Sequence, residues 1–181
     1  LAQPWISGGL LRDIEGKEQR GSRRGKLTPM SAFFSFTGLH KLPGLKSIHK
    51  DREPMPSEPT AMETISGAFM MMDRPSFEAI GGFDENYFLH VEDIDICRRA
   101  RAAGGDILFV PNASVMHYGS TSKVSPMKVE FEKLKGFIYY FWNYRAGFMS
   151  KFLTALATPF MAAALMGRAA YLTLRLAAIG R

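Results

Sequence analysis

The sequence predicts an α/β fold that is followed by C-terminal helices. Residues 65–72 form an apolar run of strand length, and a short helical segment follows at residues 77–80. A longer helix is expected from Glu92, and a further strand at residues 107–110. A strand, two helices and a strand in this order are typical of an α/β domain.

The first 60 residues predict one strand, one helix and long connections. Residues 6–11 favour a strand, and residues 13–16 favour a turn after it. The basic run at residues 19–26, QRGSRRGK, is more typical of a solvated loop than of a phosphate clamp. Residues 30–39 favour a helix, whereas three prolines exclude a regular helix from residues 50–60.

Glycine and proline set the limits of the central elements. Pro75 suits the first turn of the short helix, and Gly81-Gly82 is expected to stop it. The helix from Glu92 has apolar residues at helical spacing and is expected to end at Gly104-Gly105. Pro111 is expected to separate the strand at 107–110 from a further extended piece.

Composition and charge narrow the class of protein. A chain of 181 residues with 46% hydrophobic and 22% charged residues can bury a core and is not disordered. Residues 61–122 are net acidic between two basic flanks, which argues against nucleic-acid binding. The basic flanks favour contact with phosphate groups or with an anionic membrane. The single cysteine, Cys97, excludes an internal disulfide, fits a reducing compartment and is expected in the core.

Three acids at the start of the second helix are the candidate chemical group. Glu92, Asp93 and Asp95 lie in its first turn, where the helix dipole favours carboxylates. They are either simple helix-start residues or the edge of a pocket, where a carboxylate can act as general base. His117, after the last extended piece, is either structural or a metal ligand.

These residues resemble a known family in their order. The segments SGAFMMMDRPSFEAIGGFDENYF, VEDIDICRRARAAGG and ILFVPNASVMHYGSTS are similar to the C-terminal half of a rhamnosyltransferase-like, family 2 glycosyltransferase. The resemblance implies a GT-A fold, an inverting transfer, a nucleotide-sugar donor and a divalent metal, Mg²⁺ or Mn²⁺. It implies an acceptor that is a saccharide or lipid-linked, in cell-surface polysaccharide assembly.

The resemblance also implies roles for individual residues. Asp93 corresponds to the catalytic base, and His117 to a residue that completes the metal shell or contacts the donor diphosphate. The expected acceptor side is formed by Gly81, Gly82, Phe83, Asp84 and Glu92. The expected donor side is formed by Ser66, Gly67 and Ala68.

One departure from the family pattern concerns the donor half. No Asp-x-Asp motif lies upstream of Asp93, so we expect the nucleotide-binding half to precede Leu1, with this chain a truncated or split product. We predict that residues 1–125 form the C-terminal half of the GT-A domain. Residues 126–181 are then a helical, membrane-associating region.

The C-terminal third predicts the membrane contact. Residues 128–149 favour a long aromatic helix, and Tyr140, Asn143 and Arg145 resemble an element that follows the catalytic domain in the family. Residues 152–167 are uncharged but interrupted by Pro159, so a helix in the membrane interface is preferred to a spanning one. This places the protein on the cytoplasmic face of the membrane. The alternative is a helical pair that folds onto the catalytic domain or forms a homodimer.

Other functional classes stay open from the sequence. A non-catalytic, membrane-associated interaction module is favoured by the missing donor half. A polymerising synthase is disfavoured, because its usual Gln-x-x-Arg-Trp element does not follow Asp93. A metal-dependent hydrolase would need more metal ligands than this chain offers.

Overall fold

The computed structural model describes the chain except residues 43, 45–46, 120–123, 145–147 and 179–181. The chain divides into two compact units. The sheet unit comprises Leu1–Leu27, Ile48–Glu85 and Glu92–Thr121. The helical unit comprises Thr28–Ser47, Asn86–Val91 and Ser122–Arg181.

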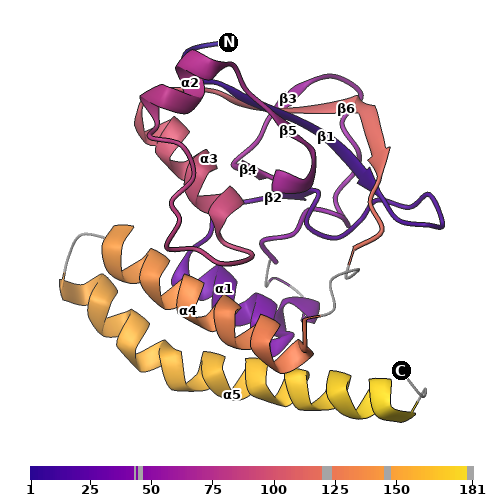
Figure 1. Cartoon of the computed structure of the whole chain (residues 1–181), viewed down its shortest axis with the longest axis vertical. Coiled ribbons are helices and arrows are strands. Elements are labelled where there is room, and N and C mark those ends of the chain that lie inside the picture. The colour runs from indigo at the N-terminus through magenta and orange to yellow at the C-terminus, as the bar shows by residue number, and fades with distance from the viewer. Residues whose placement is uncertain (43, 45–46, 120–123, 145–147, 179–181) are drawn as a thin grey trace. The chain divides into compact units, whose positions relative to one another are not determined.

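The sheet unit is built around two long parallel strands (Figure 1). β1 (Ile6–Arg12) pairs in parallel with β6 (Ile107–Met116), and both are rich in apolar residues that are buried. β5 (Met70–Met71) pairs antiparallel with β1, and β3 (Thr60–Ala61) pairs antiparallel with β6. The resulting order is β3-β6-β1-β5.

A second, two-stranded ladder lies in the same unit. β2 (Arg23–Arg24) pairs antiparallel with β4 (Thr64–Ile65), so that Arg24 lies opposite Thr64. The 3-10 turn η2 (Gly67–Phe69) follows β4 directly. The predicted continuous strand over residues 65–72 is therefore wrong, because η2 separates β4 from β5.

Two helices complete the sheet unit. α2 (Arg74–Ala79) begins after Asp73, whose carboxylate accepts a hydrogen bond from the Ser76 backbone N–H. α3 (Glu92–Ala102) contributes buried residues to a core shared with the strands. The core consists of Ile6, Leu10, Ile65, Ile80, Ile96, Cys97, Ala100, Ile107 and Phe109. The predicted helices from Pro75 and Glu92 are thus confirmed, as is the burial of Cys97.

β6 is one strand rather than two. Its pairing with β1 shifts between Gly9, which lies opposite Val110, and Leu10, which lies opposite Ser114. Pro111 lies within this irregularity, where a missing N–H disturbs the ladder least. The predicted break at Pro111 is therefore wrong, since a bulge absorbs the proline.

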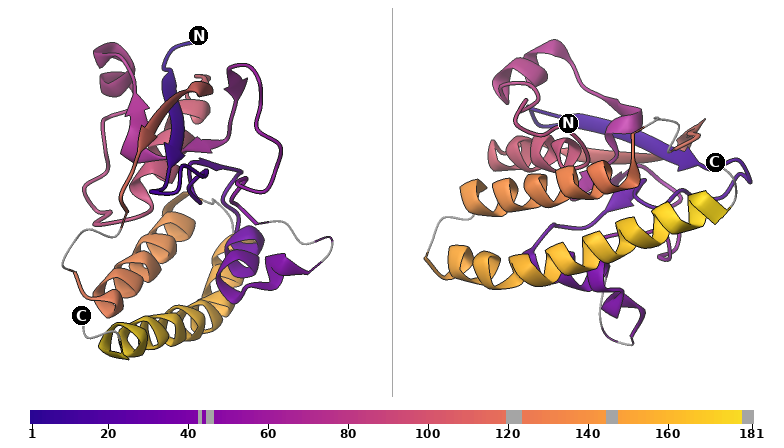
Figure 2. Two further views of the ribbon diagram at one scale, coloured as in Figure 1. Left: turned by 90° about the vertical axis from the view of Figure 1, so that its right-hand side faces the viewer. Right: turned by 60° about the horizontal axis from the view of Figure 1, so that its bottom comes forward.

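The helical unit contains three α-helices in the described residues. α1 (Pro29–Thr37) starts with a capping box between Thr28 and Ser31 and is followed by the 3-10 turn η1 (Leu39–Lys41). α4 (Pro126–Tyr144) and α5 (Phe148–Ala178) run side by side, as Figures 1 and 2 show.

The C-terminal helices differ from the prediction in two ways. The predicted helix over residues 128–149 is divided, since α4 ends at Tyr144 and α5 begins at Phe148. The predicted interruption at Pro159 is wrong, because α5 continues through this residue. Arg145, which the family resemblance singled out, lies outside the described residues.

The buried surfaces of α4 and α5 face each other and include polar groups. α5 buries Thr154, Met161, Leu165 and Ala169. On α4, Glu130 is buried and pairs with Lys133 at 3.0 Å and with Arg168 of α5 at 3.7 Å. This ion pair links the two helices.

The close approach at the β1–β6 bulge gives a first prediction. A methyl group at Gly9 would lie 2.3 Å from the Ala113 carbonyl oxygen and 2.5 Å from the Phe69 ring. Gly9→Ala is expected to destabilise the protein by about 1–3 kcal/mol or more through overpacking. Gly25→Ala is the matched control, because its nearest contacts would be ordinary at 3.8 Å. Urea unfolding of both variants is the measurement, and equal midpoints would refute the close approach.

Candidate functional site

Asp93 is the candidate catalytic carboxylate, and it lies in the first turn of α3. The residue is only 8% exposed. Its Oδ2 accepts hydrogen bonds from Arg24 Nη2 and, at 3.2 Å, from the backbone N–H of Gly67. Its Oδ1 is buried and has no hydrogen-bond partner among the residues that the structure describes. A buried acceptor without a partner is unfavourable, which is why such an oxygen is a natural place for a ligand hydroxyl.

The β2–β4 ladder brings Arg24 to this carboxylate. Arg24 is 8% exposed, and its Nη2 also donates to the Ile65 carbonyl at 3.2 Å. Arg23 is buried as well. The prediction that residues 19–26 form a solvated loop is therefore wrong for these two arginines. Each is buried because it has an anionic partner, as a buried charge requires.

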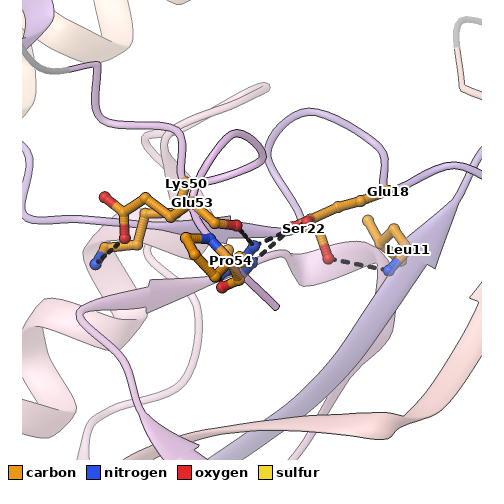
Figure 3. A network of polar contacts seen from close by, with 7 residues as sticks. Leu11, Glu18, Ser22, Lys50, Glu53 and Pro54 are labelled. Carbon is orange, nitrogen blue, oxygen red and sulfur yellow. Dashed lines mark hydrogen bonds and ion pairs between the residues drawn. The ribbon is translucent and has the colours of Figure 1, made fainter. Parts of the chain in front are cut away.

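Arg23 fixes the segment that carries Arg24. Its guanidinium donates to the Glu18 carboxylate at 2.8 and 3.0 Å. It also donates to the carbonyls of Glu53 at 2.6 Å and Pro54 at 3.0 Å (Figure 3). Ser22 Oγ accepts from the Leu11 N–H of β1 at 3.0 Å. The segment is thus tied both to the sheet and to the proline-rich loop.

Asp95 has a structural role, unlike Asp93. It is fully buried, and its carboxylate accepts from Arg99 Nε at 2.7 Å and lies 3.6 Å from Arg98. Arg99 also donates to the Ile80 carbonyl at the end of α2. Asp95 therefore connects α3 to α2 through Arg99. The catalytic role of Asp93 stays a prediction.

Cys97 lies on the inner face of α3. Burial raises the pKa of its thiol to about 12, and the charge of Asp93 contributes in the same direction. At neutral pH the thiol therefore stays protonated, which makes it a poor nucleophile and metal ligand. This agrees with the expectation that Cys97 is a core residue.

Among the expected donor-side residues, Gly67 contacts Asp93. A methyl group on Gly67 would lie 3.3 Å from Asp93 Cβ, so the site requires a glycine or a small displacement. Ser66 begins η2 and its hydroxyl accepts from the Ala68 N–H at 3.3 Å. Ser66 and Ala68 thus shape the turn that presents the Gly67 N–H, and their donor role stays a prediction.

The expected acceptor-side residues form the turn after α2. Gly81 and Gly82 have φ values of 75° and 67°, which favour glycine. Phe83 is exposed and its ring meets Phe77 edge-on at 6.0 Å. Asp84 and Glu92, each partly exposed, also belong to the sheet unit. The contacts described above do not connect this turn with Asp93, and its acceptor role stays a prediction.

His117 follows β6 and is oriented by Gln19. The Gln19 side-chain amide donates to the His117 carbonyl at 3.2 Å, and its oxygen lies 2.6 Å from Nδ1. Because the amide oxygen only accepts, Nδ1 is the donor in this contact. No group of three His, Cys, Asp or Glu side chains gathers as a metal site in the described part of the chain.

The comparisons with known proteins give the family. Residues 51–134 match the family described as "Glycosyltransferase like family 2". Over this segment, which is less than half of the chain, the sequence is similar to that family. The match bears out the predicted family resemblance, and the structure confirms a mixed α/β fold with C-terminal helices.

Two curated relatives are rhamnosyltransferases. The chain is 40% identical over 58 residues to an "N-acetylglucosaminyl-diphospho-decaprenol L-rhamnosyltransferase" of Mycobacterium tuberculosis, covering 32% of this chain and 19% of that protein. It is 36% identical over 73 residues to "Rhamnosyltransferase WbbL" of Escherichia coli, covering 39% of this chain and 28% of that protein. The matched part is thus under a third of the length of either relative.

A solved structure of GalNAc-T7 with UDP, GalNAc and Mn²⁺ is a distant neighbour. The TM-score is 0.40 at 16% identity, over 77% of this chain and 29% of that chain. A likeness of this size supports no inference about ligands.

Sequence reasoning missed Arg24 and Gln19. Both lie in the basic run or next to it, and their partners are 69 and 98 residues away in the chain. The sequence feature that could have pointed to Arg24 is the pair Arg23-Arg24 between two small residues, Ser22 and Gly25. A short polar segment of this kind does not specify which distant acid it will meet.

The contrast between buried and exposed ion pairs gives the second prediction. Asp95→Asn is expected to lower the free energy of unfolding by roughly 2–4 kcal/mol, because Arg99 loses its buried anionic partner. Glu78→Gln is the control, because the side chains of the Arg74–Glu78 pair are 86% and 60% exposed. This substitution should change the free energy of unfolding by no more than about 0.5 kcal/mol. Urea denaturation measures both. If Asp95→Asn lowered the free energy of unfolding as little as the control does, the structural role of Asp95 would be contradicted.

Proposed function

We propose that this chain forms part of an inverting glycosyltransferase. The enzyme transfers a sugar from a nucleotide-sugar donor to a hydroxyl of a saccharide or lipid-linked acceptor in cell-surface polysaccharide assembly. The observation that carries the proposal is the buried Asp93 carboxylate, whose Oδ1 has no partner among the described residues while Oδ2 is held.

The chemistry follows from this arrangement. Asp93 Oδ1 accepts the proton of the acceptor hydroxyl, and the oxygen attacks the anomeric carbon. The bond from that carbon to the nucleotide diphosphate breaks on the opposite face, so the configuration inverts. The nucleoside diphosphate leaves with the bonding electron pair, and the proton stays on Asp93 until it passes to solvent.

The relatives suggest the substrates to test first. Their names specify rhamnosyl transfer and, for the mycobacterial protein, a diphospho-decaprenol acceptor. We therefore propose a nucleotide-activated rhamnose as donor and a sugar on a polyprenyl diphosphate as acceptor. In this proposal Gly67, with Ser66 and Ala68, borders the donor sugar. The turn from Gly81 to Asp84, with Glu92, borders the acceptor.

A divalent cation, Mg²⁺ or Mn²⁺, enters the proposal through the family resemblance. His117 is the expected ligand, and its neighbour Gln19 is an amide rather than a carboxylate. Without a cluster of three ligands in the described residues, this chain's side chains alone do not fit a metal centre. The mechanism above therefore contains no step through a metal.

Substitution of Asp93 tests the proposal. In the intact protein, Asp93→Asn keeps the shape of the side chain but removes the base. Sugar transfer is expected to fall by roughly 10²–10⁴-fold. Asp106→Asn is the matched control, because Asp106 is exposed and bonds only to the chain start in the described contacts. Transfer from labelled nucleotide-sugar is the measurement.

Two outcomes decide between the functions. Transfer by Asp93→Asn within a few-fold of the original protein would remove Asp93 as base. If the original protein showed no transfer with any nucleotide-sugar while still binding membranes, the alternative function would hold. That alternative is an inactive, membrane-associated interaction module, and the exposed face of α5 favours it.

The outward face of α5 supports a membrane contact. One helix in the described residues, Lys151–Arg175, is long and apolar enough to cross a membrane, with a mean hydropathy of 1.3 over an 18-residue window. The residues at successive steps of three or four on the exposed side are Phe152, Leu156, Phe160, Ala163, Gly167, Tyr171 and Leu174. No charge interrupts them.

The charges of α5 lie beside this apolar face. Lys151, Arg168 and Arg175 are exposed, and α5 contains no Asp or Glu. Exposed apolar residues bordered by cations are the pattern of a helix that lies in an anionic membrane surface. We therefore propose that residues 126–181 hold residues 1–125 at the cytoplasmic face of the membrane.

Vesicle binding tests the membrane contact. Leu156→Glu combined with Phe160→Glu in the intact protein is expected to weaken binding to anionic vesicles by about tenfold or more. Two side chains, 56% and 59% exposed, lose their burial in lipid. The double control Ile14→Glu with Met55→Glu adds the same charge at exposed apolar residues of the sheet unit. Equal losses in both proteins would mean that charge, not the α5 face, governs binding.

A further inference from the structure

We propose that Arg24 is a positioning residue for Asp93, and that it leaves Oδ1 as the atom that accepts the substrate proton. This inference rests on the proposed function and adds a residue beyond the site residues expected from the sequence. The described contacts of Asp93 fall on one oxygen only. Both the Arg24 guanidinium and the Gly67 N–H donate to Oδ2.

The asymmetry of these contacts determines which oxygen reacts. A carboxylate oxygen that accepts two hydrogen bonds is a weaker proton acceptor than one that accepts none. Oδ1 is buried and keeps its lone pairs without a partner among the described residues. A partial rotation of the carboxylate would weaken the ion pair with Arg24, so this pair fixes the direction in which the other oxygen points.

Arg24 is itself held in place, which a positioning residue requires. Its Nη2 donates to the Ile65 carbonyl at 3.2 Å, and its backbone belongs to the β2–β4 ladder. The neighbouring Arg23 anchors the same segment to Glu18 and to the carbonyls of Glu53 and Pro54. The guanidinium therefore has a defined position, and Asp93 takes its orientation from it.

Lysine cannot reproduce this arrangement. A guanidinium is planar and directs its N–H groups in fixed directions, whereas an ammonium is a compact charge on a flexible stem. Arg24→Lys keeps the positive charge but loses the fixed geometry between the Ile65 carbonyl and Asp93. It should therefore fold and retain only part of the activity, which separates orientation from charge.

One competing role is direct substrate binding. Arg24 Nε is buried without an acceptor among the described residues, so it retains a donor that a substrate oxygen could use. A residue that binds substrate in this way changes KM, whereas a residue that acts through Asp93 changes kcat. The split between kcat and KM therefore distinguishes the two roles.

The experiment measures kcat, the KM of each substrate and the urea midpoint for four variants of the intact protein. These are Arg24→Lys, Arg24→Ala, Asp93→Asn and the double variant Arg24→Ala/Asp93→Asn. Arg101→Gln is the control. Arg101 lies in the last turn of α3, the helix that carries Asp93 in its first turn, and it pairs with Glu63 at 3.2 Å. Millimolar guanidinium chloride is added to each variant as a chemical substitute for the missing side chain.

We expect Arg24→Ala to lower kcat by about 10- to 100-fold, with each KM within about threefold. The kcat of Arg24→Lys should lie between that of Arg24→Ala and that of the original protein. Guanidinium should restore part of the activity of Arg24→Ala and none of that of Asp93→Asn. The double variant should be no slower than Asp93→Asn alone, because Arg24 acts only through Asp93.

Several results would overturn the inference. They are an unchanged kcat in a folded Arg24 variant, a raised KM at constant kcat, or additive losses in the double variant. Should Arg24→Ala not fold, full activity of a folded Arg24→Lys would have the same consequence. If Asp93→Asn keeps its activity, the proposed function fails instead, so the two failures are distinguishable.

Discussion

The ion pair between Arg24 and Asp93 is the interaction on which the site depends. A carboxylate this deeply buried is unfavourable without a cationic partner, and removing one member of a buried pair typically costs several kcal/mol. The chain provides the partner by placing β2 against β4, next to the start of α3. The turn η2 then brings the Gly67 N–H to the same oxygen, which requires a residue without a Cβ at that point.

The acidic cluster at the start of α3 divides two tasks between neighbouring residues. Asp95 pairs with Arg99 through Oδ2 and holds α3 against the end of α2, although its Oδ1, like that of Asp93, has no hydrogen-bond partner among the described residues. Asp93 can therefore keep one oxygen without a partner, because the helix does not depend on that oxygen for its attachment. A reactive side chain must be carried by an element that is firmly held. Asp95, separated from Asp93 by one residue, helps to hold α3 in this way.

Local patterns in the sequence predicted the elements, whereas distant pairings were not predictable. The apolar spacing after Glu92 and the glycines around it defined α3 and the turn after α2, since these depend on neighbouring residues. The partnership of Arg24 with Asp93 depends on strand pairing, and that of Gln19 with His117 joins two segments 98 residues apart. The breaks predicted at Pro111 and Pro159 are wrong for a related reason. A bulge in β6 accommodates Pro111, and packing of α5 accommodates Pro159.

The C-terminal helices expose more large apolar side chains than a soluble bundle is expected to. A soluble helix turns its apolar stripe inward and its polar face to water. Here Met161, Leu165 and Ala169 of α5 are buried as in a soluble helix. Phe160, Tyr171 and Leu174, however, are exposed. The membrane contact that we propose would cover these exposed apolar side chains. An acceptor carried on a lipid would then reach an enzyme held at the same surface.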